Sequence, residues 1–97
     1  MYALAIIRYR RPIEEVLAHY GAHRLYLQQL KKEGVLVASG PLEPRFGGAL
    51  LLRVPDATAQ EAMNRVRDHD PYWTAGVAQY ELLGWNVKTG REDLDRA

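Results

Sequence analysis

His23 is the side chain whose type and position most suggest acid–base chemistry. It lies in the apolar stripe of a predicted helix, between Tyr20 and Leu27, where spacings of three and four residues place side chains on one face. A histidine on such a face is often a half-buried core residue bonded to a backbone carbonyl. The alternative is a proton-transfer group, which needs a partner for one ring nitrogen while the other stays free.

Asp70 is the partner that the sequence offers. Met63, Val66 and Asp70 step by three and four residues, so the carboxylate extends the inward stripe of a second predicted helix. If the two helices pack antiparallel, the end of the second approaches the first half of the first. A carboxylate that accepts from one ring nitrogen would fix the tautomer of His23 and leave the other nitrogen for catalysis. Asp-Pro is also an ordinary helix-end or N-cap pair, which is the structural alternative.

Four further residues are predicted to line a small-molecule pocket beside this pair: His19, Ser39, Tyr72 and Trp73. Ser39 has no nucleophile context and also suits a strand end. The two aromatic residues equally suit the core or a dimer contact.

A metal site is the weaker alternative for the histidines. His19 and His23 are one helical turn apart, and His69 supplies a third imidazole. No acidic residue lies between the first two, unlike the zinc-protease helix motif. We therefore predict neither a metal nor another cofactor.

The composition narrows the class of protein. Thirteen basic and twelve acidic side chains leave a net charge of +1, which argues against nucleic-acid or membrane-surface binding driven by bulk charge. Arg8, Arg10 and Arg11 cluster at a strand end, as a local anion site or a solvated terminus. Cysteine is absent, and no signal-peptide pattern or membrane-length apolar run occurs. We expect a cytoplasmic protein.

The elements that must position His23 and Asp70 alternate in type. Pro12 suits a helix start, Gly34 a helix stop, and Thr58 with Glu61 forms a capping-box pattern. We expect one domain over residues 1–87 and a loose polar tail over 88–97. The expected elements are a strand at 2–9, a helix from 12 to 33, strands at 35–39 and 48–54, a helix from 58, a short turn at 71–75 and a strand at 77–87.

The order β-α-β-β-α-β predicts an α+β, ferredoxin-like fold. Its economical form is a four-stranded antiparallel sheet with two helices on one face. The strands at 2–9 and 48–54 are apolar at consecutive positions, so the other face is expected to be apolar as well. A bare apolar face is unusual for a monomer, and we therefore predict a homodimer through this face, a dimeric α+β barrel. The alternative is a misread register and a mixed face.

These features together resemble the YciI-like family, over about residues 2–86. The resemblance rests on His23 in H-R-L-Y-L-Q-Q-L, G-V-L-V-A-S-G-P-L from Gly34 to Leu42, Gly47-Gly48 before an apolar strand, Asp70-Pro71-Tyr72 followed by Ala75-Gly76, and a last strand ending near Trp85. It implies a dimeric barrel and a His–Asp pair in a cleft, which corresponds to His23 and Asp70. Members of the family often carry an arginine one turn before the histidine, where this chain has His19.

Two functions stay open at this point. One branch of the family looks like dehydrochlorinases of chlorinated hydroxyquinols, which implies acid–base elimination or isomerisation on a small cyclic compound. The first hypothesis is such a cofactor-independent enzyme, and a cofactor-free monooxygenase is a neighbouring possibility on the same architecture. The second is a non-catalytic dimeric domain that binds a small ligand or assists another enzyme.

Overall fold

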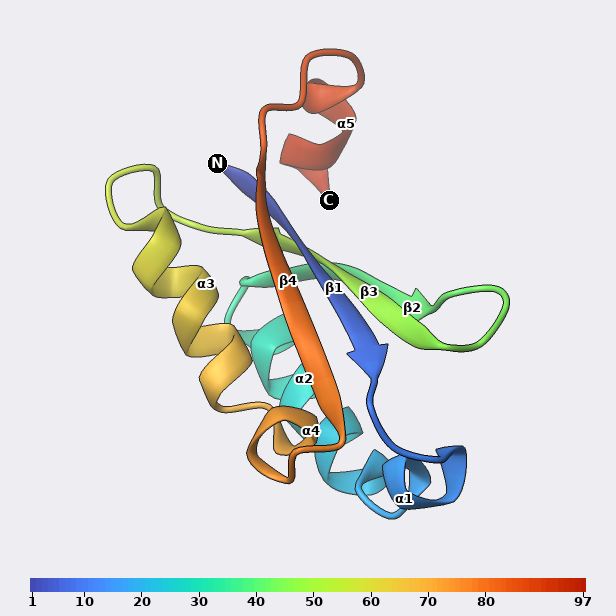
Figure 1. Ribbon diagram of the computed structural model, residues 1–97. Helices are drawn as coiled ribbons and strands as arrows, with labels where there is room; N and C mark the ends of the chain where they lie inside the picture. Colours follow the sequence, from blue (N-terminus) through green and yellow to red (C-terminus); the bar gives the residue numbers. More distant parts are fainter.

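A computed structural model describes all 97 residues of the chain. The elements, in order, are β1 (Tyr2–Tyr9), α1 (Ile13–Leu17), α2 (Tyr20–Lys32), β2 (Leu36–Pro41), β3 (Gly47–Arg53), α3 (Ala59–Asp68), α4 (Pro71–Thr74), β4 (Ala78–Trp85) and α5 (Arg91–Arg96) (Figure 1).

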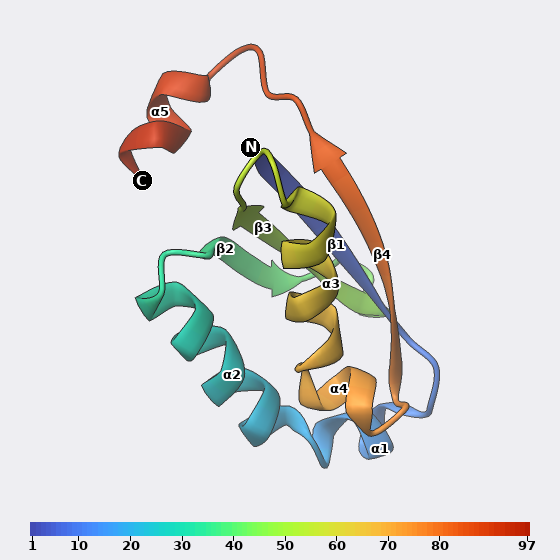
Figure 2. The ribbon, with the colours of Figure 1, turned by 90° about the vertical axis from the view of Figure 1, so that its left-hand side faces the viewer.

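The four strands form one antiparallel sheet in the order β2-β3-β1-β4. The helices α2 and α3 lie side by side on one face of this sheet (Figure 2). The predicted α+β, ferredoxin-like fold is therefore confirmed. The two central strands, β1 and β3, pair antiparallel, and each crossover through the helices connects two strands that are not neighbours in the sheet.

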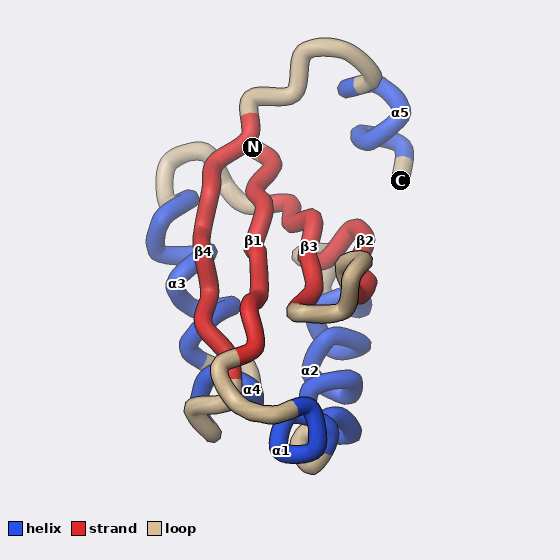
Figure 3. Tube along the Cα trace, turned by 45° about the vertical axis from the view of Figure 1, so that its right-hand side comes forward, coloured by secondary structure: helices blue, strands red, loops and turns tan.

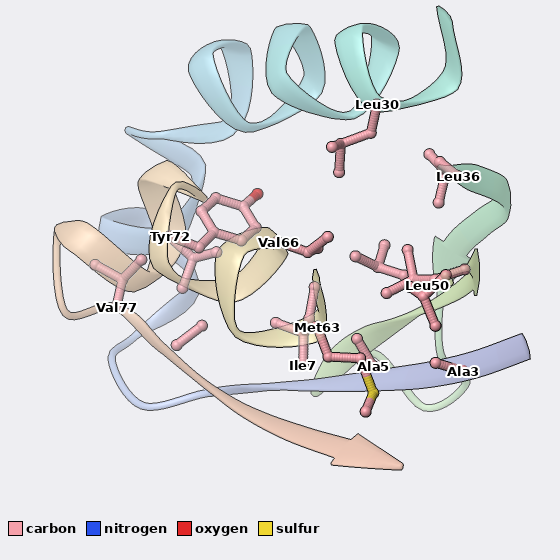
Figure 4. Close-up of a cluster of buried hydrophobic side chains, with 14 residues drawn as sticks. Ala3, Ala5, Ile7, Leu30, Leu36, Leu50, Met63, Val66, Tyr72 and Val77 are labelled. Atoms are coloured by element: carbon pink, nitrogen blue, oxygen red, sulfur yellow. The ribbon is translucent and has the colours of Figure 1, made fainter. Parts of the chain in front are cut away.

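The core lies between the sheet and the helices (Figure 4). Ala3, Ala5 and Ile7 point inward from β1, and two of these three side chains are methyl groups, so the helices can lie close to the central strand. Leu50 and Leu52 from β3 fill the space beside them. These contacts hold α2 and α3 against the same surface and fix where their side chains meet.

The opposite face of the sheet carries alternate residues of the same strands. Leu4 of β1 is directly opposite Leu51 of β3 and Leu83 of β4, and Ile6 is opposite Ala49 in the next row. Leu83 is 42% exposed, and in the view of Figure 3 no helix lies across the middle of the strands. This face is apolar along the middle of the sheet, as predicted, with an Arg8–Glu81 ion pair at 2.8 Å beside it.

The predicted helix from residue 12 to 33 is interrupted. The chain turns at Ala18 and His19, so α1 and α2 are separate helices, and His19 is the N-cap residue of α2. The backbone of His19 has φ −109° and ψ 8°, outside the helical geometry that the periodic pattern assumes. The change matters because it turns the side chain of His19 away from the stripe that contains His23.

The polar tail, which we expected to be loose, forms the short helix α5. The Tyr2 hydroxyl donates to Oδ1 of Asp95 at 2.6 Å, and the Arg53 guanidinium donates to the carbonyl of Leu94 at 2.8 Å. Tyr2 and Arg53 are paired in the sheet, so the tail covers one end of it. No helix of the chain is long and apolar enough to span a bilayer.

Candidate functional site

The His23–Asp70 pair is the centre of the site. Nδ1 of His23, on α2, lies 2.7 Å from Oδ1 of Asp70, at the start of α4. The histidine is 8% exposed and the aspartate 0%. Two residues that are 47 positions apart in the chain are thus joined by a buried, charge-assisted hydrogen bond.

The local sequence explains how Asp70 comes to this place. A residue before proline is excluded from the helical region, and Asp70 accordingly has φ −73° and ψ 126°, which ends α3. Pro71 then occupies the first position of α4, where its missing N–H costs nothing. The Asp70 carboxylate accepts from the backbone N–H of Tyr72 at 3.0 Å and so caps the new helix while it also binds His23.

Tyr80 completes the surroundings of the carboxylate. Its hydroxyl donates to Oδ2 of Asp70 from β4. Burial raises the pKa of the Tyr80 phenol far above its ordinary value, and the negative charge of Asp70 and this hydrogen bond raise it further. The phenol therefore stays neutral and remains a donor. With donors from α2, α4 and β4, the buried carboxylate has a partner on each oxygen and is held in one orientation.

Tyr72 fixes the plane of the imidazole. The rings of His23 and Tyr72 are stacked, with centroids 3.9 Å apart and an angle of 6° between the planes. The Tyr9 ring meets the Tyr72 ring edge-on, with the two centroids 6.2 Å apart. Burial, then the neighbouring Tyr9 and Asp70, raise the pKa of Tyr72 to about 12, so this ring is also neutral. The histidine is therefore constrained by a hydrogen bond at one edge and by a ring on one face.

The second nitrogen of His23 faces a cavity. Nε2 has no hydrogen-bond partner in the protein. Every fully buried side-chain nitrogen or oxygen of the chain has such a partner, so Nε2 is accessible to solvent. A cavity of about 450 Å³ adjoins it between α2 and β2, a size suited to a small ring compound. Its lining is Tyr9, Tyr20, His23, Arg24, Leu27, Gln28, Lys31, Leu36, Val37, Ala38, Ser39, Gly40, Pro41, Arg45 and Tyr72.

Two of the four predicted pocket residues line this cavity. Ser39 comes from β2, where it is opposite the buried Leu50 and therefore on the helix side of the sheet, and Tyr72 comes from α4.

His19 and Trp73, the other two predicted pocket residues, lie outside this cavity. The turn at residues 18–19 places His19 in a shallow groove with Arg10, Arg11 and Glu15. Trp73 packs edge-on against Tyr80, at 6.3 Å, because the short helix α4 directs consecutive side chains to different sides.

The three histidines do not converge. Nδ1 of His69 lies 2.9 Å from the carbonyl oxygen of Arg65, at the exposed end of α3. No group of three histidine, aspartate or glutamate side chains is close enough to hold a metal ion. The arrangement at His23 is instead a buried pair of one imidazole and one carboxylate joined by a hydrogen bond.

Sequence reasoning missed Tyr80 and the basic residues of the cavity. The alternation of β4 placed Tyr80 on the same side as Ala78 and Leu82, and this inward position was the signal that could have found it. Arg24 and Lys31 line the cavity because their side of α2 faces β2. Which side of α2 faces β2 is known only once the helix has packed against the sheet. Arg45 lies in the loop between β2 and β3, and no periodicity predicts where a loop residue points.

Known proteins support the fold. A comparison with solved structures found 5-chloro-2-hydroxyhydroquinone dehydrochlorinase from Burkholderia phenoliruptrix AC1100, in complex with 2,5-dihydroxybenzoquinone. The TM-score is 0.75 at 20% sequence identity, over 91% of this chain and 96% of the other. A comparison with curated proteins found no match. The model of the YCII-related domain matches residues 1–86, nearly the whole chain, and the chain therefore belongs to the YCII-related domain family.

Proposed function

We propose that this protein is a small acid–base enzyme in which His23 is the proton-transfer group and Asp70 orients it. The observation that carries the proposal is the buried bond of 2.7 Å on Nδ1, with Nε2 open to a cavity. An imidazole held in this way has one defined tautomer, because the Nδ1–H donates to Asp70 and Nε2 keeps its lone pair. Such a positioned base contributes about 10²- to 10⁴-fold to a reaction rate.

The chemistry that suits this base is elimination or isomerisation. Nε2 takes a proton from a C–H or O–H of the substrate, and the electron pair left behind forms a new double bond. In an elimination the bond to a leaving group breaks, and the leaving group departs as an anion with those electrons. In an isomerisation the imidazolium returns the proton to another atom of the same compound. Neither course needs an oxidant or a reductant.

The substrate class that we propose is a small cyclic compound. The cavity of about 450 Å³ and its tyrosine surface suit a single ring. The structurally similar dehydrochlorinase, whose name gives 5-chloro-2-hydroxyhydroquinone as its substrate, supports the same class. Loss of a proton and chloride from that compound leaves a hydroxybenzoquinone, so the reaction is balanced without a cofactor.

The test compares His23→Asn with the parent protein. The asparagine amide can keep a hydrogen bond to Asp70 but removes Nε2, so the fold is expected to survive. Chloride release from 5-chloro-2-hydroxyhydroquinone, and proton exchange on related hydroxyquinones, are expected to fall at least 10²-fold. His69→Asn is the matched control, since His69 is exposed and outside the cavity. Equal turnover in the two variants would remove His23 from the mechanism. Ring compounds that bind without any turnover in the parent protein would support the competing function, a non-catalytic ligand-binding domain.

We also propose that the chain forms a homodimer through the open face of the sheet. The row Leu51–Leu4–Leu83 gives this face an apolar centre, and Trp85, 42% exposed, adds to its margin. A second copy with the same face buries both rows by two-fold symmetry. Sedimentation velocity on Leu83→Glu is expected to show a monomer, whereas Leu25→Glu, at a residue 69% exposed on α2, leaves the dimer intact. A parent protein that sediments as a monomer at every concentration contradicts this assembly.

A further inference from the structure

The cavity beside His23 is lined by three cationic side chains and no carboxylate. Arg24 and Lys31 come from α2, and Arg45 comes from the loop between β2 and β3. None of the three forms an ion pair with an aspartate or glutamate. The chain as a whole has a net charge of only +1, so this positive charge is a local property of the cavity.

The fold holds Arg45 at the cavity although it lies in a loop. Gly47, just after it, packs so tightly against β1 that a Cβ there would lie 1.7 Å from the carbonyl oxygen of Ile7. The N–H of Tyr9 donates to the carbonyl of Phe46 at 2.9 Å, which ties the loop to the end of β1. Tyr9 and Arg45 line the same cavity, and Tyr9 is the main cause of the raised pKa of the Arg45 guanidinium. Arg45 thus has a defined anchor beside the tyrosine that also meets Tyr72.

Asp70, the carboxylate bound to His23, does not neutralise these cations at the cavity. Asp70 is 0% exposed, and its oxygens are occupied by His23, Tyr72 and Tyr80. A ligand therefore meets a surface of tyrosine rings with basic groups at its edge. Rings of the ligand can stack on or pack against the tyrosines, and an anionic group of the ligand is attracted to the guanidinium groups.

We propose that the ligand of this cavity is a small planar ring compound that carries negative charge, as a ring carboxylate or an ionised ring hydroxyl, bound through Arg24 and Arg45. That this ligand is also the substrate rests on the proposed function, whereas the anion-binding site itself does not. The two arginines would orient the ring toward Nε2 of His23 and favour the ionised form of the compound.

The test measures binding of a charged and a neutral ring of the same shape. Calorimetric titration of the full chain with 2,5-dihydroxybenzoate and 2,5-dihydroxybenzamide is expected to show at least about tenfold tighter binding of the carboxylate. Arg24→Gln and Arg45→Gln are each expected to weaken carboxylate binding about fivefold to tenfold and to leave amide binding unchanged. Arg65→Gln is the control, because it removes the same charge from an exposed position on α3 outside the cavity. Added salt is expected to weaken the carboxylate complex selectively.

Several results would overturn the anion site. Equal affinity for the two probes excludes a role for ligand charge, and an equal loss in Arg65→Gln assigns the effect to net charge. Absence of binding for both probes at millimolar concentration also contradicts the site. The outcome is separable from that of the proposed function, since His23→Asn is expected to keep selective carboxylate binding. Selective binding without turnover of any ring compound would retain the anion site and refute the acid–base enzyme.

Discussion

Replacing Asp70 separates its structural role from its proposed orienting role. Three donors converge on this fully buried carboxylate: Nδ1–H of His23, the N–H of Tyr72 and the hydroxyl of Tyr80. Hydrogen bonds to a charged group contribute about 1.5–3 kcal/mol each, and buried donors left without a partner add to that cost. Asp70→Ala removes all three bonds and the cap of α4, so the expected loss is about 5 kcal/mol or more. A domain of this size has a total stability of about 5–15 kcal/mol.

Asp70→Asn is expected to behave differently. The amide oxygen can still accept from His23 and Tyr72, and the amide N–H₂ can donate to the Tyr80 oxygen if the phenol hydrogen turns away. The fold should then lose only about 1–2 kcal/mol, the difference between charged and neutral hydrogen bonds. Proton transfer should nevertheless fall about 10²- to 10⁴-fold, because the neutral amide no longer stabilises the imidazolium that forms on His23.

Urea unfolding, followed through Trp73 and Trp85, gives the stabilities, and the assay of the His23 variants gives turnover. Asp70→Ala within about 1 kcal/mol of the parent protein would show that the three bonds do not hold the site together. Full turnover in Asp70→Asn would show that the carboxylate does not orient the base, and would leave it as a helix cap only.

Two further predictions concern stability. Burial is the largest cause of the raised pKa of three tyrosines. The pKa values of Tyr26 and Tyr72 rise to about 12, and that of Tyr80 is also raised, whereas a tyrosine in an unfolded chain has a pKa of about 10. The unfolded state therefore loses protons above pH 10 that the folded state keeps, so the free energy of unfolding is unaffected below pH 10 and falls as the pH rises from 10 to 12. Tyr80→Phe removes one such group, so the free energy of unfolding, measured by urea titration, should fall less steeply with pH, by at most about 1.4 kcal/mol per pH unit. The same pH slope in the variant and the parent protein would contradict the burial argument. Gly47→Ala places a methyl group 1.7 Å from the Ile7 carbonyl oxygen, a backbone atom that cannot turn aside, and should cost about 3 kcal/mol or more. Gly21→Ala in α2 meets no atom within 4 Å and should instead stabilise the protein by about 0.5–1 kcal/mol, so equal urea midpoints for these two variants would refute the close approach of β1 and β3.

The pattern of apolar residues determined most of the fold. Strands and helices alternate because the period of the apolar residues changes between consecutive and helical spacing, and glycine and proline separate them. The inward stripes of two helices already contained His23 and Asp70, since a polar residue at a core position stands out from its neighbours. Right-handed crossover then allows few arrangements of four strands, and the sheet order follows from that rule.

What only the tertiary structure decided are contacts between elements and positions in irregular segments. Tyr80 meets Asp70 because β4 returns beside β1 and passes under α4, and no local pattern measures that distance. The turn at His19 interrupts a stripe that looks continuous, because a periodic pattern describes which side chains are apolar and not the backbone angles between them.

The cavity is the clearest case. The side chains of α2 that face β2 and the loop residue Arg45 come together only after the sheet has formed, and the loop is held there by the close contact of Gly47 with β1. Spacing alone therefore placed His23 and Asp70 on the inward stripes of two helices, and it left a structural role open for each of them. The charge and shape of the space that it faces depend on packing between segments far apart in the chain, which sequence periodicity does not encode.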